Sequence, residues 1–306
     1  MRIVMAGASG FLGGWLGKRL GAAGHDVTRL VRRPPREPAE VSWDPGAGRL
    51  DPAALAGAGA VVNLAGAGVG DHRWTARYKA TLRASRVDPT ATLARTLAEL
   101  PAGDRPGVLL NSSGISGYGH TGDRTVTEAA PLGAGFLPDV CRAWEAATGP
   151  AADAGVRVAL LRTAPVLHRD GGLLKPQLLP YRLGLGGRFG GGRQWSPWIA
   201  LADWLEAVVF LLERDVAGPV NVVSPGLVTN ADFTKALGRA LHRPAVLPIP
   251  GFALRVLLGE FSVEVLNGSG GVPAVLTDAG FTFRYVELDA ALRAALREDP
   301  SFAEAS

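Results

Sequence analysis

Cysteine and lysine are both scarce in this 306-residue sequence. Its single cysteine, Cys141, excludes an internal disulfide and cysteine-based zinc cages, and it is typical of a reducing compartment. The five histidines lack metal-ligand spacing, so we expect no metal site. The net charge of +4 comes with only four lysines, because most basic residues are arginines scattered along the chain. Nucleic-acid binding is therefore not expected.

Long hydrophobic runs are also missing. Glycines between Gly7 and Gly14 interrupt the N-terminal apolar stretch, which we therefore predict to be folded structure rather than a signal peptide. The apolar stretch Ala245–Leu258 contains two prolines and an arginine, and it is shorter than the roughly 20 residues that a membrane span needs. We expect a cytoplasmic protein that does not contact a membrane.

Short apolar runs alternate with longer segments of helical spacing in the first half of the chain. The runs are Arg2–Ala6, Val27–Val31, Ala60–Leu64, Val108–Asn111 and Val156–Leu161. This alternation is typical of βαβ units, and runs that are apolar on both faces are typical of strands covered by helices on both sides. The sequence therefore predicts an α/β fold with a Rossmann-like doubly wound parallel sheet.

The second half is predicted to be mostly helical. The glycine-dense segment Leu173–Trp198 is predicted to be an irregular loop. Further elements are expected as a helix at Asp203–Leu212, a strand at Val220–Val223, and helices at Asn230–Leu241, Leu247–Leu258, Val272–Ala279 and Leu288–Arg297. The charged tail from Glu298 is expected to fray.

A glycine-rich loop follows the first predicted strand and opens the first predicted helix. Gly7, Gly10 and Gly13 are each separated by two residues. Glycines at such a turn let the backbone approach a pyrophosphate, whose charge is stabilised by the N–H groups at the helix start. A tight strand-to-helix turn without a ligand is the alternative. We favour dinucleotide binding because the loop opens a βαβ pattern.

The end of the second predicted strand indicates which dinucleotide binds. NAD enzymes place a carboxylate there for the ribose hydroxyls, whereas this chain has Arg32 and Arg33. A guanidinium can form bidentate bonds with a 2′-phosphate. The sequence therefore favours NADP, with a solvated basic loop as the alternative.

Several stretches together resemble the extended short-chain dehydrogenase/reductase superfamily. The resemblance is to its atypical, epimerase/dehydratase-like branch with a small C-terminal domain of unknown function, and it covers nearly the whole chain. Besides the glycine loop, it rests on residues 61–66, 73–75, 85–86, 144–145, 161–163, 182–187, 192–195 and 281–285.

The resemblance implies roles for individual residues. Gly7, Gly10, Phe11, Leu12 and Gly13 would hold the pyrophosphate, and Arg32 would meet the 2′-phosphate, with Arg33 beside it. Other cofactor contacts are implied for Leu64, Ala65, Gly66, Ser112, Arg162 and Val166. Substrate contacts are implied for Arg73, Arg182, Arg193, Trp195 and Trp198.

The proton-transfer pair of the wider superfamily is absent. That pair is a tyrosine four residues before a lysine, in which the ammonium lowers the pKa of the phenol. The residues four positions after the four tyrosines are Leu82, Gly122, Leu185 and Asp289. If Trp144 and Glu145 set the register of the helix, the two positions are occupied by Leu137 and Cys141. In addition, Ala200 stands where similar proteins tend to have a histidine.

Tyr118 and Ser113 are the candidate catalytic residues. Tyr118 belongs to a loop that follows a strand end, where catalytic side chains concentrate, although a tyrosine packed against its own loop is the alternative. We predict an NADP-dependent oxidoreductase or epimerase-like enzyme that acts on a small carbonyl or hydroxyl substrate. Because the tyrosine–lysine pair is missing, a non-catalytic NADP(H) sensor is the alternative.

The predicted domains follow from these assignments. Residues 1–165 form the NADP-binding domain, and 199–225 complete its sheet and helices. Residues 166–198 and 226–306 form a smaller, mostly helical substrate-side region that includes a C-terminal small domain at 245–298. The expected partner is a small-molecule substrate, and the chain is expected to be a monomer or a homodimer.

Overall fold

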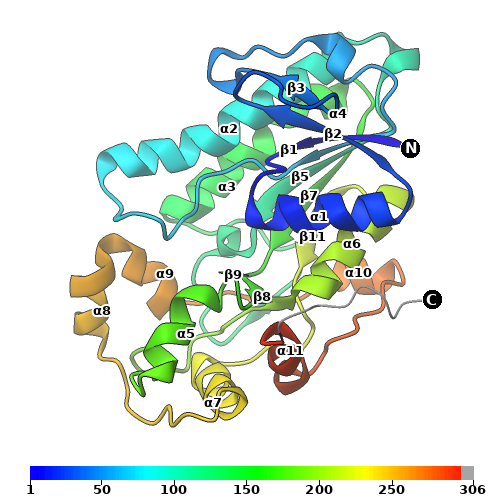
Figure 1. The fold of residues 1–306 in the computed structure, drawn as a ribbon. Coiled ribbons are helices and arrows are strands. Elements are labelled where there is room, and N and C mark those ends of the chain that lie inside the picture. The colour runs from blue at the N-terminus through cyan, green and yellow to red at the C-terminus, as the bar shows by residue number, and fades with distance from the viewer. Residues whose placement is uncertain (298–306) are drawn as a thin grey trace. The chain divides into compact units, whose positions relative to one another are not determined.

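The computed structural model describes residues 1–297, which divide into two compact units (Figure 1). The first unit consists of Met1–Ser113, Asp139–Leu161 and Val208–Val220. The second consists of Gly114–Pro138, Arg162–Ala207 and the residues from Asn221 onward. The tail from Glu298, which we expected to fray, lies outside the described residues.

A seven-stranded sheet forms the centre of the first unit, and three of its strands continue into the second. Its strands are β1 (Arg2–Ala6), β2 (Asp26–Val31), β3 (Glu40–Ser42), β4 (Ala60–Asn63), β5 (Val108–Gly114), β7 (Arg157–Thr163) and β11 (Gly218–Val222). Their order is β11-β7-β5-β4-β1-β2-β3, and the pairs β3–β2, β2–β1, β1–β4 and β4–β5 are parallel. The chain reverses its direction of winding between β1 and β4, where open α/β sheets bind ligands. The predicted Rossmann-like fold is confirmed.

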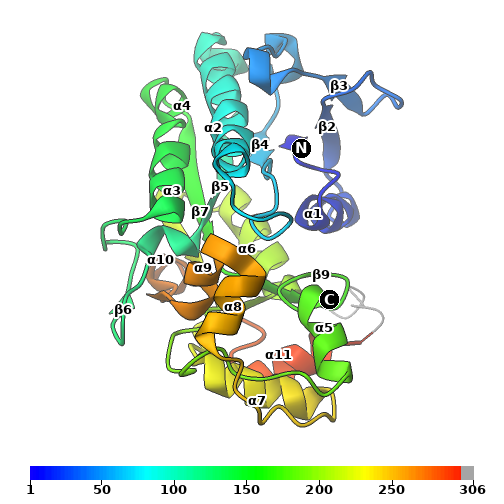
Figure 2. The same cartoon turned by 90° about the vertical axis from the view of Figure 1, so that its left-hand side faces the viewer.

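Helices cover both faces of this sheet. α1 (Phe11–Ala22) lies on one face, and α2 (Ala76–Glu99), α3 (Phe136–Ala146) and α4 (Gly149–Asp153) lie on the other (Figure 2). α2 begins after Thr75, whose hydroxyl accepts a hydrogen bond from the Tyr78 N–H at 3.1 Å. This cap fixes where the 24-residue helix starts and therefore which of its turns face the sheet.

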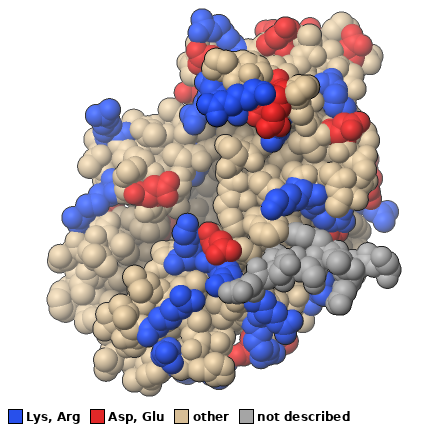
Figure 3. Space-filling model, in the orientation of Figure 1, with Lys and Arg blue, Asp and Glu red and all other residues tan. Residues whose placement is uncertain are grey.

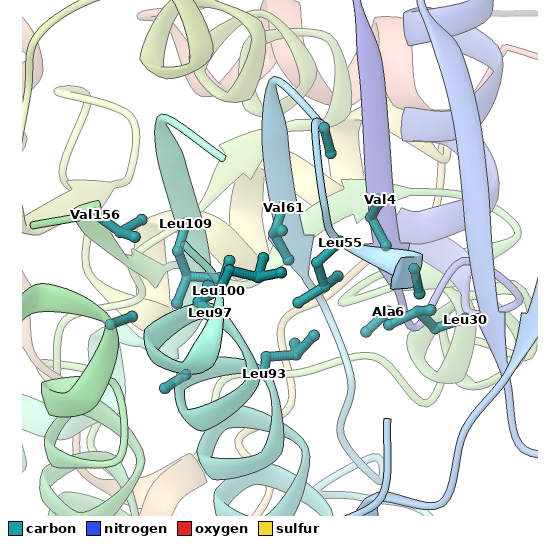
Figure 4. Close-up of a cluster of buried hydrophobic side chains, with 14 of the residues drawn as sticks. Val4, Ala6, Leu30, Leu55, Val61, Leu93, Leu97, Leu100, Leu109 and Val156 are labelled. Carbon is teal, nitrogen blue, oxygen red and sulfur yellow. The ribbon is translucent and has the colours of Figure 1, made fainter. Parts of the chain in front are cut away.

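The core of the first unit lies between α2 and the sheet (Figure 4). Leu93 and Leu97 of α2 are one turn apart and have no exposed surface, and they pack in one cluster with Val61 and Leu109 of the neighbouring strands β4 and β5. Burying such a side chain contributes about 1.5–3 kcal/mol. This packing holds α2 against β4 and β5, whose carboxyl ends carry the polar residues described below.

Short strands and helices build the second unit, which includes α6 only up to Ala207. β8 (Val166–His168) pairs with β10 (Ile199–Ala200) and β9 (Gly171–Gly172), and β6 (Thr125–Val126) pairs with β12 (Gly270–Gly271). The helices are α5 (Lys175–Arg182), α6 (Leu201–Glu213), α7 (Asn230–Ala240), α8 (Gly251–Leu258), α9 (Ser262–Leu266), α10 (Ala274–Asp278) and α11 (Leu288–Ala295). The buried carboxylate of Asp203 accepts the N–H groups of Arg284 and Tyr285, which ties the C-terminal segment to α6.

Two sequence predictions need correction in this part of the chain, and one strand of the first unit is absent from the predicted elements. The segment Leu173–Trp198 is not irregular throughout, because α5 occupies Lys175–Arg182 and buries Leu178 and Tyr181, three residues apart. The predicted helix from Leu247 begins only at Gly251, since Pro250 serves as its N-cap. The strand β3 was missed because three residues are too few to show an alternating pattern.

Charged side chains are mixed over the surface. On the face drawn in Figure 3, basic and acidic side chains are interspersed. The scattered arginines of the sequence thus remain scattered on this face. No helix of the described residues combines the length and the apolar character needed to cross a membrane.

The end of α7 provides a first testable prediction. The Arg243 N–H donates to the Gly238 carbonyl at 2.9 Å, and the His242 N–H donates to the Arg239 carbonyl at 3.1 Å. This helix ending needs a left-handed residue, and His242 (φ 52°) is the one non-glycine residue with positive φ in the described part of the chain. His242→Gly should therefore raise the free energy of unfolding by about 1 kcal/mol. Urea unfolding measures this gain, which His242→Ala should not show; equal stabilities of the two variants would contradict the prediction.

Candidate functional site

A cleft of about 1840 Å³ opens in the first unit at the carboxyl ends of β1, β2 and β4. It is lined by residues 7–10, 29–33 and 64–67, which follow or end these strands, and by one side of α2 from Thr81 to Pro89. The cleft therefore lies where the strand order reverses, and its walls include the glycine loop and both arginines singled out from the sequence.

The three glycines of the loop have different structural roles. Gly7 has a left-handed φ of +78°, and a Cβ on it would lie 2.6 Å from the Leu64 carbonyl. A Cβ on Gly13 would lie 2.2 Å from the Gly7 carbonyl oxygen, so Gly13 allows α1 to pack against the loop. Gly10 is less confined, because the nearest atom to its Cβ would be the Gly7 oxygen at 3.3 Å, and it lines the cleft. Gly7 and Gly13 thus shape the loop, and Gly10 leaves room above it.

The start of α1 has the character of an anion site. Its N-cap, Gly10, provides no side-chain hydrogen bond, and the first turn contains no acidic residue. The N–H groups of a first helical turn lack acceptors within the helix and form the positive end of the helix dipole. Phe11 and Leu12, predicted to hold a pyrophosphate, are the first two residues of this turn.

The two arginines after β2 differ in their partners. Arg33 donates through Nη1 and Nη2 to the two carboxylate oxygens of Glu40, each at 2.8 Å. The hydrogen bonds from Arg33 are the main reason that the pKa of Glu40 is lowered to about 2. Arg32 is exposed, lines the same cleft and forms no hydrogen bond or ion pair within residues 1–297. Arg32 is therefore the side chain available for a ligand, and Arg33 holds Glu40.

A buried polar network lies below the cleft, where β4 and β5 end. The Asn63 amide donates to Asn111 Oδ1 at 2.7 Å and to Thr90 Oγ1 at 2.9 Å. The Trp144 indole N–H donates to the same Thr90 hydroxyl at 2.9 Å. These bonds join two strands to α2 and α3, so they fix the positions of both helices at this edge of the sheet.

Ser113 continues from this network along β5. Its hydroxyl is buried and donates to Glu145 Oε1 of α3 at 2.7 Å. A hydroxyl that donates to a carboxylate can accept a further hydrogen bond but has no second proton to give. Ser112, predicted to contact the cofactor, is not among the residues that line the cleft, and its carbonyl accepts a hydrogen bond from the Asn111 amide.

The structure argues against Tyr118 as the proton donor. Its side chain is buried in the second unit, and its hydroxyl donates to Asn221 Oδ1 at 2.8 Å and accepts from Arg162 Nη1 at 2.9 Å. Burial raises the pKa of the phenol, although the Arg162 guanidinium opposes that rise. The hydroxyl of Tyr118 is thus held by residues distant in sequence rather than by its own loop.

Three other predicted contacts are also buried. Arg162 binds Tyr118, and Val166 starts β8; each is 4% exposed. Trp198, predicted to bind substrate, has no exposed surface, and its indole N–H donates to the Gly226 carbonyl at 2.8 Å. The roles predicted for these three residues stay predictions; in the described structure their side chains pack within the second unit.

The remaining substrate candidates stay accessible. Arg73 in the first unit, and Arg182 and Arg193 in the second, are exposed. Trp195 is half-buried, and its indole nitrogen is buried without a hydrogen-bond partner. No group of three or more histidine, cysteine, aspartate or glutamate side chains within residues 1–297 could hold a metal ion.

Comparison with known proteins assigns the family. Residues 3–135 match the NAD dependent epimerase/dehydratase family, and residues 249–295 match a domain of unknown function, DUF1731. An epimerase family protein of Mycobacterium tuberculosis is 42% identical over 95% of this chain and 96% of its own. The structure of the human epimerase family protein SDR39U1, crystallised with NADPH, is similar at a TM-score of 0.88 and 32% identity, over 96% of this chain and 99% of the human one.

A second similar structure is longer than this chain. It is a nucleoside-diphosphate sugar epimerase from Corynebacterium glutamicum, 35% identical with a TM-score of 0.77, and the match covers 96% of this chain but 57% of that one. The resemblance stated from the sequence is confirmed. By sequence and by structure, the chain belongs to the NAD dependent epimerase/dehydratase family, in its branch with a C-terminal DUF1731 domain.

Proposed function

We propose that this chain binds NADP(H) in the cleft of the first unit and catalyses hydride transfer on a small carbonyl or hydroxyl substrate. The observation that carries the proposal is Arg32, an exposed guanidinium without a partner in the described chain, in a cleft that also contains the glycine loop. The crystallisation of the human relative with NADPH supports the same cofactor.

The residues of the cleft would share the binding of NADP(H). The loop from Gly7 to Gly10 and the start of α1 would hold the pyrophosphate, and Arg32 would hold the 2′-phosphate. Leu64, Ala65 and Gly66 line the same wall. When bound, NADP(H) supplies or accepts the hydride. The protein contributes the position and the electrostatic environment of that exchange.

A proton must also move when a carbonyl is reduced or a hydroxyl is oxidised. The hydrogen bond between Ser113 and Glu145 favours this pair over Tyr118, because it joins a hydroxyl to a group that can take up a proton. Arg73, Arg182, Arg193 and Trp195 are the candidates for substrate binding. Because the Corynebacterium glutamicum relative is a nucleoside-diphosphate sugar epimerase, nucleotide sugars are further substrates to test.

The proposal predicts a preference for NADP(H) over NAD(H). Arg32→Ala should weaken NADPH binding by about 1.5–3 kcal/mol and should hardly change NADH binding, because only NADPH carries the 2′-phosphate. Calorimetric titration of both cofactors measures this, with Arg36→Ala as a control in the same basic group. Equal affinities of the parent protein for NADPH and NADH would contradict the assignment.

A non-catalytic NADP(H) sensor is the second candidate function. It is favoured by the hydrogen bonds that engage both predicted catalytic hydroxyls, those of Tyr118 and Ser113, within the protein. The tyrosine–lysine pair is also missing, so neither predicted hydroxyl replaces its phenol as a free proton donor. A sensor would bind both redox forms without consuming either.

One experiment separates the two functions. NADPH absorbance is followed across a panel of aldehydes, ketones, quinones and nucleotide sugars. Turnover that is lost in Ser113→Ala supports the enzyme, whereas tight binding of NADPH and NADP⁺ without turnover supports the sensor. The cytoplasmic location and the monomeric or dimeric state stay predictions; the Arabidopsis thaliana relative is named chloroplastic.

A further inference from the structure

Arg86 on α2, to which the resemblance assigned no role, is placed against the wall of the cleft. Its Nη2 donates to the Ala67 carbonyl at 2.9 Å, and its Nη1 donates to the Leu82 carbonyl at 3.0 Å. A Cβ on Gly66 would lie 3.4 Å from the guanidinium carbon, so the group stands directly behind the cleft-lining residues Gly66 and Ala67. The other side of the guanidinium covers the ring of Trp144, 5.2 Å from its centre.

The guanidinium of Arg86 has no carboxylate in direct contact. Among residues 1–297 it forms no ion pair; its partners are carbonyl groups, the Ser85 hydroxyl and an aromatic ring. The side chain is partly buried, and burial lowers its pKa. A cation withdrawn from water without a carboxylate costs free energy, so its retention calls for a role beyond holding one loop.

The position of Arg86 relative to the sheet indicates that role. Its carbonyl accepts a hydrogen bond from Thr90, one helical turn further along α2, and Thr90 binds Asn63 and Asn111 at the ends of β4 and β5. Arg86 thus lies one turn beyond these strand ends. On α3 it faces Trp144, whose neighbour Glu145 holds Ser113. The cation contacts Trp144, and Ser113 contacts Glu145. Arg86 and Ser113 therefore meet adjoining residues of α3 at the same edge of the sheet.

We infer that Arg86 is a positioning residue that places a permanent positive charge beside the reacting end of bound NADP(H), and so favours the neutral nicotinamide of NADPH over the cationic ring of NADP⁺. This inference rests on the proposed binding of NADP(H). Since the two forms share their phosphates and differ only at the nicotinamide, the ratio of their dissociation constants reports charge near that ring. A residue that merely holds the loop changes both constants by the same factor.

A substitution on α3 can place a positive charge near the position of the Arg86 guanidinium. Cys141 is buried one turn before Trp144, the residue on which the guanidinium rests, and its thiol interacts with the Arg86 charge. A lysine at position 141 would bring an ammonium to the same neighbourhood from the opposite helix. Ser85 supplies a neutral control, because its hydroxyl accepts the Ala67 N–H at 3.0 Å and so holds the same residue of the loop.

The test compares dissociation constants for NADP⁺ and NADPH, measured by calorimetry on the full chain. In Arg86→Met the preference for NADPH should fall about tenfold, which is the effect of one unit charge at roughly 10 Å in an effective dielectric of about 20. Arg86→Lys should keep most of the preference. Adding Cys141→Lys to Arg86→Met should restore part of it. Ser85→Ala should weaken both forms equally and leave the ratio unchanged.

Other outcomes overturn the inference. If Arg86→Met loses affinity for both forms equally, Arg86 positions the loop or binds a phosphate and does not act on the nicotinamide. If the parent protein binds NADPH but shows no preference over NADP⁺, the inference fails while the proposed function stands; if it binds neither form, both fail. Should Arg86→Met not fold, Arg86→Gln provides the same comparison, because its amide can still donate to the Ala67 carbonyl.

Discussion

Gly10→Val should fold normally and weaken NADPH binding by roughly a hundredfold or more. Gly10 lines the cleft, and a Cβ on it would approach only the Gly7 carbonyl oxygen, at 3.3 Å. A branched side chain there fills the space that a pyrophosphate needs close to the backbone, without displacing packed neighbours. Thermal unfolding and calorimetric titration of the same preparation measure the two effects separately.

Its neighbours in the loop make the prediction specific. Gly13→Val should lower the free energy of unfolding by about 2–3 kcal/mol, because its Cβ would lie 2.2 Å from the Gly7 carbonyl oxygen. Gly14→Ala should leave binding nearly unchanged and raise the free energy of unfolding by about 0.5–1 kcal/mol, since a Cβ on Gly14 has no atom within 4 Å and alanine is the better helix former. Full NADPH affinity in a folded Gly10→Val protein would show that the loop is only a structural turn.

Tyr118→Phe should destabilise the protein by about 1–3 kcal/mol and leave NADPH affinity within about twofold of the parent. Removing the hydroxyl leaves the buried groups of Arg162 and Asn221 each without one hydrogen-bond partner. The cost is the desolvation of those groups, which water cannot reach to compensate. Urea unfolding and NADPH titration measure the two quantities.

A second tyrosine provides the control for this prediction. Tyr285 also belongs to the second unit, and its hydroxyl makes no hydrogen bond within residues 1–297, so Tyr285→Phe should change stability by less than about 0.5 kcal/mol. Unchanged stability of Tyr118→Phe, together with loss of turnover on a substrate found in the panel, would return Tyr118 to the mechanism.

Local sequence patterns are sufficient to predict the fold and the glycine loop. Strand β1 occupies the predicted Arg2–Ala6, and α7 begins at the predicted Asn230, because apolar runs and N-caps act through neighbouring residues. The spacing of Gly7, Gly10 and Gly13 is likewise a pattern of neighbouring residues. The exposed arginine after β2 could also be found, since the second strand of such a fold ends beside the cofactor loop.

Partners that are distant in sequence could not be found in this way. Arg33 is as plausible as Arg32 by position, and only the structure shows that Glu40 engages it. Tyr118 has the right functional group in the right kind of loop, but its hydroxyl donates to Asn221 Oδ1, 103 residues away. The catalytic role predicted for Tyr118 rests on its neighbours in sequence, whereas the pKa of its phenol depends on burial and on Arg162.

The sequence by itself thus determined the Rossmann-like sheet, the glycine loop and the family, because helix and strand periodicity, turn geometry and motif spacing are properties of short segments. The tertiary structure alone decided which polar groups are paired. It assigned Arg33 to Glu40, Ser113 to Glu145 and Arg86 to the Ala67 carbonyl. The physical reason is that hydrogen bonding and desolvation depend on which side chains packing brings together, and packing joins segments that lie far apart in the chain.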